Sequence, residues 1–398
     1  MFRVVVALLV LLPASSAFAA EDIRGSERFA ELESVKAFDQ FMATLADMRN
    51  MILEDAVNER EASEGMRFLL RAVAMSQDVT GDGYPPAPHF ARMDTPRRKV
   101  GGDNPDAEYD NLVWQGGVDY KITGNIGSVD HLSFTALVRE PSGRSRSIGG
   151  LNERTLGADA NGDFTLWLTG EKPDAPGAWI KTSAGDDGSM LVRQYIGDRA
   201  SERLASYQIE VVGRKRLDPL PPSRDADVAA GIRGARLALG GIGRLHRYVS
   251  PSISDPPNAF KLRNSDDFGA DISSADNLYV IGTYGFDSNE ALIVEVDPLD
   301  VRFWNFAIES PWHESVDYFQ RKTSRTHDDV SIDPDGKVRF LIAHAPSEHP
   351  NYLETAGHSR GFMVFRWVGE RETKTPLPTV TKLPLGDAIA RAKTLGGR

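Results

Sequence analysis

The sequence contains no cysteine, which excludes disulfide bonds, thiolate catalysis and a cysteine-linked lipid anchor. It also lacks the glycine-rich Rossmann and P-loop patterns in a strand-turn-helix setting, so we expect no nucleotide cofactor and leave any other cofactor unknown. Compact H-x-H and H-x-x-x-H pairs are missing, and on this ground we expect no metal site. The apolar run at residues 4–12 is too short to span a bilayer, and no later run approaches the roughly 20 residues that this needs. We therefore expect no transmembrane segment in the mature chain.

Positive charge is in the minority. The formal net charge is -11, from 57 acidic and 46 basic residues that are mixed along the chain. An acidic surface repels phosphate backbones, so nucleic acid is not an expected partner.

The first 20 residues have the pattern of a signal peptide. They read MFRVVVALLVLLPASSAFAA, with one arginine, an apolar core and the small-residue sequence Ala17-Phe18-Ala19 before the expected cleavage point. We predict a signal peptide over residues 1–20 and a periplasmic or secreted protein.

The remaining chain divides into helical and strand-rich parts. An N-terminal helical segment and linker are expected over 21–104. Its second helix runs from Ala62 to Met75, and its first helix has a core face made of Leu32, Val35, Phe38, Met42, Leu45, Met48 and Ile52. Short alternating runs predict a first β unit over 105–215 and a second over 270–372. Between them, residues 216–269 form a linker and connecting helix, with Ser223 as N-cap and Val228, Ile232, Ala235, Leu239 and Ile242 on one face. Residues 373–398 form a C-terminal tail with a short helix.

The two strand-rich regions share three blocks in the same order. DNLVW at Asp110 matches DNLYV at Asp276, and DANGDFTLWL at Asp159 matches DPDGKVRFLI at Asp333. WIKTSAGDDGSMLVR at Trp179 matches YLETAGHSRGFMVFR at Tyr352. Ordered matches of this kind indicate duplication. We predict a mainly β fold with two related antiparallel β-sandwich or jelly-roll-like units, plus the N-terminal helical segment and the connecting helix.

Both copies keep one arginine in an apolar strand. Arg193 aligns with Arg366, and a buried guanidinium needs a carboxylate or carbonyl partner. Asp110 and Asp276 are the candidates. A structural ion pair is the favoured interpretation, and a ligand contact is the alternative.

The differences between the copies suggest where a site lies. His344 falls where the first copy has Gly170, and His358 and Arg360 fall in the turn where it has Asp186 and Asp187. The second copy also holds five of the eight histidines. We therefore predict a ligand pocket in the second unit, because function resides in side chains grafted on a fold. Its candidate residues are His344, His358, Arg360, Tyr352, Trp304, Trp312 and Arg325.

Two ligand chemistries fit this inventory. Carboxylates beside Trp304 and Trp312 in residues 303–329 would suit a sugar. Arg325, Arg360 and His358 would instead supply donors for an organic anion. Zinc would require His344 and His349 to converge with His327 and Asp328.

Three long segments resemble a known family. DNLYVIGTYGFDSNEALIVEVDP, FWNFAIESPW and SIDPDGKVRFLIAHAPSEHPNYLETAGHSRGFMVFRW are similar to the bacterial exported family catalogued as domain of unknown function 1214, as is DNLVWQGGVDYKITG in the first copy. The resemblance covers residues 106–368. It implies a β-rich fold and carries over no catalytic residue.

These observations predict an exported protein that binds or processes a polar molecule of the envelope or the environment, either a glycan or an anionic small molecule. Whether it is a hydrolase, a lyase or a non-catalytic binding protein stays open. The alternative is a structural or assembly protein of the cell envelope.

Overall fold

The computed structural model describes residues 28–140, 145–215, 218–220, 222–253, 257–263, 277–369 and 377–395. The expected signal peptide and Asp276 lie outside these ranges. No helix within them combines the length and the apolar character needed to cross a membrane.

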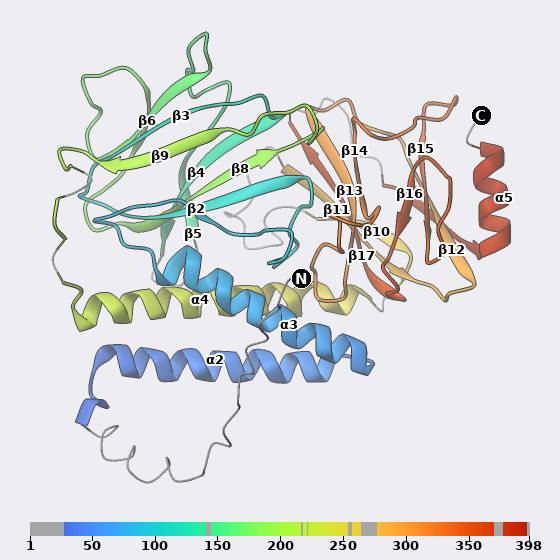
Figure 1. The fold of residues 1–398 in the computed structure, drawn as a ribbon, viewed down its shortest axis with the longest axis horizontal. Coiled ribbons are helices and arrows are strands. Elements are labelled where there is room, and N and C mark those ends of the chain that lie inside the picture. Colours follow the sequence, from blue (N-terminus) through green and yellow to red (C-terminus); the bar gives the residue numbers. More distant parts are fainter. Residues whose placement is uncertain are drawn as a thin grey trace, which may run out of the picture.

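The first β unit is a sandwich of two sheets (Figure 1). One sheet has the strand order β1-β2-β8-β4-β5 and the other the order β7-β6-β3-β9. The strands are β1 Ala91–Arg92, β2 Ala107–Gln115, β3 Tyr120–Asn125, β4 His131–Arg139, β5 Ser145–Asn152, β6 Asp163–Thr169, β7 Ala178–Lys181, β8 Asp187–Tyr195 and β9 Ser206–Val211. Alternate side chains such as Trp114, Phe134 and Val192 fill the space between the sheets.

The second β unit repeats this arrangement, with sheets in the orders β10-β11-β17-β13-β14 and β16-β15-β12-β18. Its strands are β10 Ala259–Arg263, β11 Asn277–Gly285, β12 Glu290–Val296, β13 Phe303–Glu309, β14 Ser324–Thr326, β15 Val338–Ala343, β16 Tyr352–Glu354, β17 Arg360–Val368 and β18 Thr379–Pro384. The core is aromatic, and the rings of Phe306 and Phe365 stack with centroids 4.1 Å apart.

The expected duplication and mainly β fold are confirmed. Strands β2 to β9 correspond in order to β11 to β18, and both units place one parallel pair, β6 with β7 and β15 with β16, in the four-stranded sheet. The turn before each of β6 and β15 closes in the same way: the Gly162 amide donates to the Asp159 carbonyl over 3.0 Å, and the Gly336 amide to the Asp333 carbonyl over 2.9 Å. Both glycines have positive φ, 87° and 84°, a conformation that favours glycine.

The register corrects one expected match. Arg193 of β8 lies opposite Tyr109 of β2, and Arg366 of β17 lies opposite Tyr279 of β11, so the two arginines correspond. Asn111 comes two residues after Tyr109, whereas Asn277 comes two residues before Tyr279. The expectation that Asn111 matches Asn277 is therefore wrong by four residues. A shift of an even number keeps the same face of the strand inward, so the alternation of apolar residues did not reveal it.

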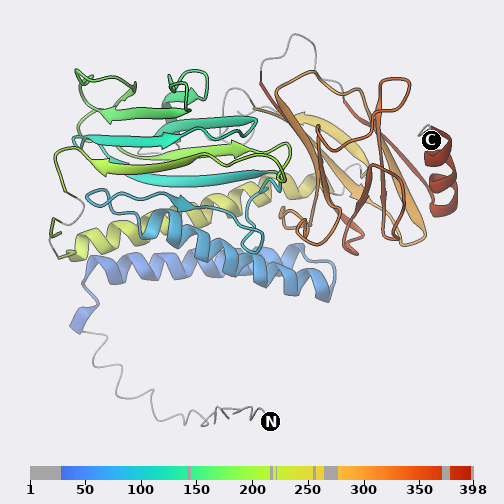
Figure 2. The ribbon, with the colours of Figure 1, turned by 45° about the horizontal axis from the view of Figure 1, so that its top comes forward.

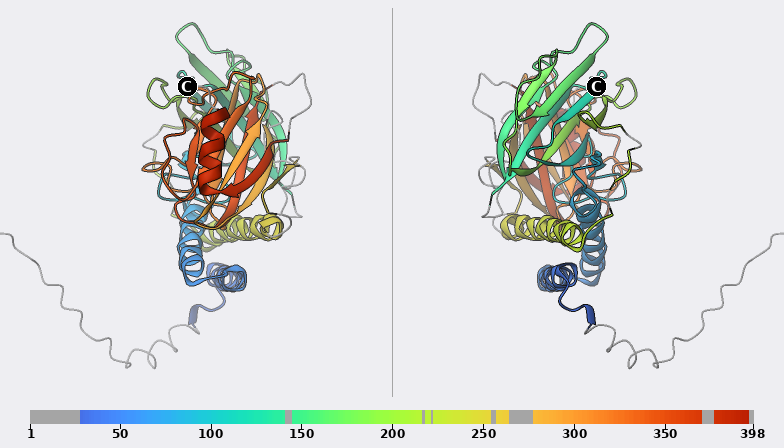
Figure 3. Two further views of the ribbon diagram at one scale, coloured as in Figure 1. Left: turned by 90° about the vertical axis from the view of Figure 1, so that its right-hand side faces the viewer. Right: turned by 90° about the vertical axis from the view of Figure 1, so that its left-hand side faces the viewer.

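A layer of helices lies against one side of both sandwiches (Figures 1, 2 and 3). It contains α2 Glu33–Asp55, α3 Glu59–Ser76 with the π-helical turn η2 Gln77–Gly81, and α4 Asp225–Val249 with the 3-10 turn η3 Ser250–Ile253. The remaining helix, α5 Leu385–Leu395, packs on the outer sheet of the second unit. The N-cap of α4 is Arg224, not the predicted Ser223, because the Asp227 carboxylate accepts the Arg224 backbone amide over 2.9 Å.

The first helix is less buried than the sequence predicts. Phe38 and Met42 of the expected core face are 52% and 45% exposed, whereas Ala37, Met48, Met51 and Ile52 are buried. Helix α2 is the outermost layer and packs mainly on α4 (Figure 2). The seven apolar residues between Leu32 and Ile52 are therefore not all covered.

Candidate functional site

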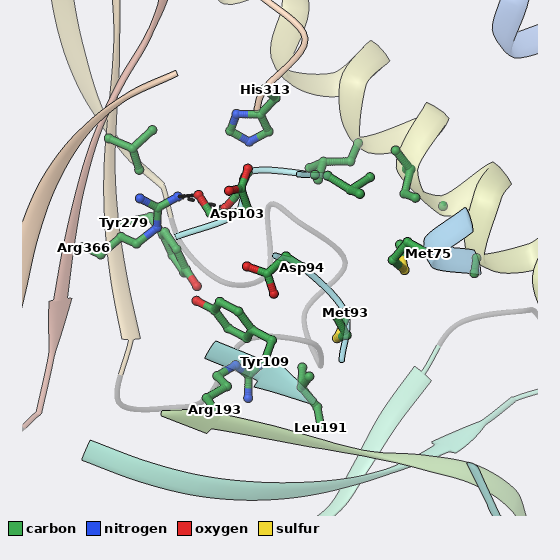
Figure 4. Close-up of a pocket in the computed structure, with 18 of the residues that line it drawn as sticks. Met75, Met93, Asp94, Asp103, Tyr109, Leu191, Arg193, Tyr279, His313 and Arg366 are labelled. Carbon is green, nitrogen blue, oxygen red and sulfur yellow. Dashed lines mark hydrogen bonds between the residues drawn. The ribbon is translucent and has the colours of Figure 1, made fainter. Parts of the chain in front are cut away.

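A cavity of about 370 Å³ lies where the five-stranded sheets of the two units meet α4. We call it the central cavity; Figure 4 shows the side chains around it. Strand β8 contributes Leu191 and Arg193, and strand β17 contributes Val364 and Arg366. These are the same two positions of corresponding strands, so each of the two strands presents one aliphatic residue and one arginine to the cavity.

The neighbouring strands add a tyrosine each. Tyr109 of β2 and Tyr279 of β11 lie opposite the two arginines and also line the cavity. The opposite wall is apolar and comes from the helices, with Met75 from α3 and Ala238, Ile242 and Leu245 from α4. A pocket with apolar walls and a few fixed polar groups is the usual form of a small-molecule site.

Arg366 is held by a buried ion pair. The residue is 3% exposed, and its Nη2 donates to Glu309 Oε1 and to the Gly102 carbonyl, both over 2.8 Å. Glu309 is fully buried and also contacts His313; burial alone would raise its pKa, but His313 and Arg366 lower it. The predicted ion pair of Arg366 is thus present, with Glu309 as the partner.

The partners proposed from the sequence do not serve this arginine. Asp110 instead accepts a hydrogen bond from Arg92 Nε over 2.6 Å, and Asp276 lies outside the described residues. Among the described atoms, Arg366 Nη1 is enclosed and has no hydrogen-bond partner. Arg366 also lines the cavity, so its guanidinium group is a candidate hydrogen-bond donor for a ligand. In the first unit, Arg193 is equally buried and donates to Thr135 Oγ1 over 3.3 Å.

Two acids complete the polar part of the cavity. Burial raises the pKa of Asp103, which accepts hydrogen bonds from the backbone amide and hydroxyl group of Ser315. Burial, reinforced by the charge of Asp103, raises the pKa of Asp94 well above its usual range. Asp94 Oδ1 is enclosed without a partner among the described atoms. Asp94 is therefore a titratable group with a strongly perturbed pKa inside the cavity, which is a feature of many functional sites.

The polar groups gather at one end of the cavity. In Figure 4 the Asp94 carboxyl group points toward the hydroxyl groups of Tyr109 and Tyr279, and Arg366 lies beside Asp103. Burial also raises the pKa of Tyr109 well above its usual range, so this hydroxyl keeps its proton. This end of the cavity therefore presents a guanidinium group, a carboxyl group with a raised pKa and phenol hydroxyls, whereas α4 forms the apolar wall.

The residues predicted from the sequence are not gathered around one cavity. His358 lies in the turn before β17, and its Nε2 is 2.7 Å from Glu64 Oε2. Arg360 is the first residue of β17 and forms two hydrogen bonds with Glu61, of 3.0 and 2.7 Å. Burial alone would raise the pKa of Glu64, but His358, with help from Arg60, lowers it to about 2. This turn therefore docks the second unit onto α3.

Trp312 belongs to the same docking region. It is 1% exposed, and its indole N–H donates to the Glu61 carbonyl over 2.9 Å while its ring stacks on Phe68. It packs between α3 and the second unit, and together with Arg360 it lines a second cavity of about 280 Å³.

The other four candidates lie elsewhere. Trp304 is buried inside the second sandwich, and Tyr352 is buried against α5 with its hydroxyl donating to the Ala343 carbonyl over 3.3 Å. His344 Nδ1 is 3.1 Å from Thr355 Oγ1, and Arg325 pairs with Asp329 over 3.0 Å.

Sequence reasoning missed Asp94, Asp103, Tyr109 and Tyr279. The repeated arginine was a usable signal, because the matching strands carry Tyr109 and Tyr279 opposite it. The two acids had no signal, since they belong to the irregular segment between β1 and β2.

Comparison with known proteins supports the fold. No family model and no curated protein matches the chain. Among solved structures, an uncharacterised protein of Burkholderia cenocepacia shares 26% identity, with a TM-score of 0.81 over 90% of this chain and 99% of that chain. A protein of Vibrio parahaemolyticus shares 12% identity over 78% of this chain and 100% of that chain, with a TM-score of 0.45. The first similarity indicates that the duplicated β fold and its helical layer occur together in another protein.

Proposed function

We propose that the protein binds a small organic anion with an apolar body in the central cavity, and that it does so in the periplasm or outside the cell. The exported location rests on the signal-peptide pattern of residues 1–20. The proposal includes membership of the exported family catalogued as domain of unknown function 1214, on the motif resemblance alone.

The observation that carries the proposal is Arg366, a buried arginine that lines a cavity with apolar walls and whose enclosed Nη1 has no hydrogen-bond partner among the described atoms. An unsatisfied buried donor costs about 1 to 3 kcal/mol, and a carboxylate oxygen would satisfy it. Charge-assisted hydrogen bonds to a guanidinium are among the stronger polar contacts. The aliphatic wall from α4 would take the apolar body of the same ligand.

The lining favours the anion over the glycan among the ligands considered. A sugar needs many hydrogen bonds, whereas Leu191, Ile242, Leu245 and Val364 make much of the lining aliphatic. The two tryptophans considered as sugar platforms are 4% and 1% exposed.

Calorimetric titration with phenylacetate, octanoate and 4-bromobenzoate tests the binding proposal. Each acid should be compared with its neutral amide, and chito-oligosaccharides serve as the glycan series. We expect one acid per chain, bound at least tenfold more tightly than the amide, because only the carboxylate pairs with Arg366.

A cavity-filling variant locates the site. Ala238 faces the cavity from α4, so Ala238→Phe should occupy the apolar end and abolish binding of the acids. Ala230→Phe is the matched control, because Ala230 is an exposed residue of the same helix. Retention of acid binding by folded Ala238→Phe, or binding of glycans alone, would contradict the proposal.

A further inference from the structure

A second polar cluster lies between the two β units. Asp130 precedes β4 and Glu202 precedes β9 in the first unit, while His327 and Asp328 follow β14 in the second. His327 Nε2 lies 3.5 Å from Asp130 Oδ2 and 3.5 Å from Asp328 Oδ1. One donor atom from each of these three residues lies within 4.8 Å of the others. None of the four residues lines the central cavity.

Gly197 leaves the space into which the carboxylates converge. A Cβ atom on this glycine would lie 2.3 Å from Asp130 Oδ2, 2.4 Å from Asp328 Oδ2 and 3.1 Å from Glu202 Oε1. Three carboxylates from both units thus point at one small volume beside the glycine. Glu202 is fixed in this orientation because its carboxylate accepts the backbone amides of Asp198 over 2.6 Å and Asp130 over 3.2 Å.

The charges of the cluster are not balanced by the contacts that surround it. Three carboxylates share one imidazole, which can supply at most one positive charge. The nearby Arg302 guanidinium is engaged with the Asp130 backbone carbonyl and with Glu153, 2.7 Å away. Asp130 Oδ2 and His327 Nδ1 are enclosed and have no hydrogen-bond partner among the described atoms. Like charges held this close in a partly buried place call for a cation.

We propose that Asp130, Glu202, His327 and Asp328 bind one divalent metal ion that joins the two β units. Carboxylates suit hard ions and imidazole suits transition metals, so a mixed set of this kind favours Mn²⁺. The donor atoms of Asp130, His327 and Asp328 all lie within 4.8 Å of one another, so one ion can contact all three.

We expect the ion to stabilise the fold and to take no part in ligand binding. The ligands come from loops of both units, so the ion would stabilise the folded chain by binding it and not the unfolded chain. Removal of the ion should therefore lower the melting temperature and leave ligand binding in the central cavity possible.

The test uses the full mature chain, stripped with EDTA and dialysed. Calorimetry and electron paramagnetic resonance should show one Mn²⁺ per chain, and Mn²⁺ should raise the melting temperature measured by circular dichroism. Asp328→Asn should weaken Mn²⁺ binding at least tenfold; the Asp328 side chain is 46% exposed, so this variant should fold. Asp174→Asn, at an exposed position in the first unit, is the matched control and should bind as the wild type does.

Gly197→Ala is a second, independent variant, because it keeps every proposed ligand and only fills the space between them. It should also weaken Mn²⁺ binding at least tenfold. No saturable Mn²⁺ binding by the wild type, or unchanged binding in Asp328→Asn, would overturn the proposal. Saturable binding of Ca²⁺ without Mn²⁺ would overturn the role of His327.

Discussion

Replacing Arg366 by methionine removes a guanidinium from a fully buried pair while keeping most of the apolar stem. Glu309 is 0% exposed and would lose its partner at 2.8 Å, leaving His313 as its remaining charged neighbour. The carbonyls of Gly102 and Asp103 would also lose a donor. Breaking one side of a buried pair costs about 3 to 5 kcal/mol, and the lost carbonyl contacts favour the upper end of that range.

Urea denaturation followed by circular dichroism measures this loss. Arg154→Met is the control, because the Arg154 side chain is 64% exposed and its variant should change stability by less than about 0.5 kcal/mol. The double variant Arg366→Met with Glu309→Leu should lose less than the single variant, since removing both charges avoids an uncompensated one. If Arg366→Met unfolds at the same urea concentration as Arg154→Met, the buried-pair argument fails.

Two further predictions concern stability. The lowered pKa of Glu64, about 2 against an ordinary 4.5, stabilises the fold above about pH 4.5, and this contribution is lost as the pH falls toward 2. As the pH falls toward 2, the free energy of unfolding should therefore decrease by about 1 to 2 kcal/mol less in His358→Gln than in the wild type. An equal decrease in both proteins would argue against the pair of His358 and Glu64. Gly102 has φ 77°, and a Cβ atom added there would lie 2.6 Å from His313 Nε2. Gly102→Ala should therefore lower the free energy of unfolding by more than the roughly 1 to 2 kcal/mol that the positive φ alone would cost. Gly117→Ala, at φ 85° with no atom within 4 Å, supplies that reference in the same urea assay, and equal losses would refute the predicted clash.

The duplicated fold could be predicted because its signals are local. The Asp-to-Gly turns before β6 and β15 and the apolar alternation of β8 and β17 are short patterns that repeat in order. The match of Asn111 with Asn277 failed because a short Asn-Leu match fits several even-numbered registers of a strand equally well.

The candidate site was harder to predict because tertiary packing decides it. Arg360 and His358 looked like ligand donors, but Glu61 and Glu64 of α3 meet them, and nothing local in the sequence links a helix near residue 60 to a turn near residue 360. In contrast, the repeated arginine correctly indicated burial at Arg366. The lack of a partner for Arg366 Nη1 among the described atoms depends on where Glu309 and the Gly102 carbonyl lie, and the sequence spacing does not specify these positions.

The central claim is that an organic carboxylate binds between the two β units with its charged end at Arg366. A crystal structure with 4-bromobenzoate, with data collected at the bromine absorption edge, tests this directly. We predict one anomalous peak in the central cavity near Ala238, with the carboxylate within hydrogen-bonding distance of Arg366 Nη1. A peak at another position, or an empty cavity in crystals grown at a bromobenzoate concentration that saturates the protein in solution, would contradict the claim.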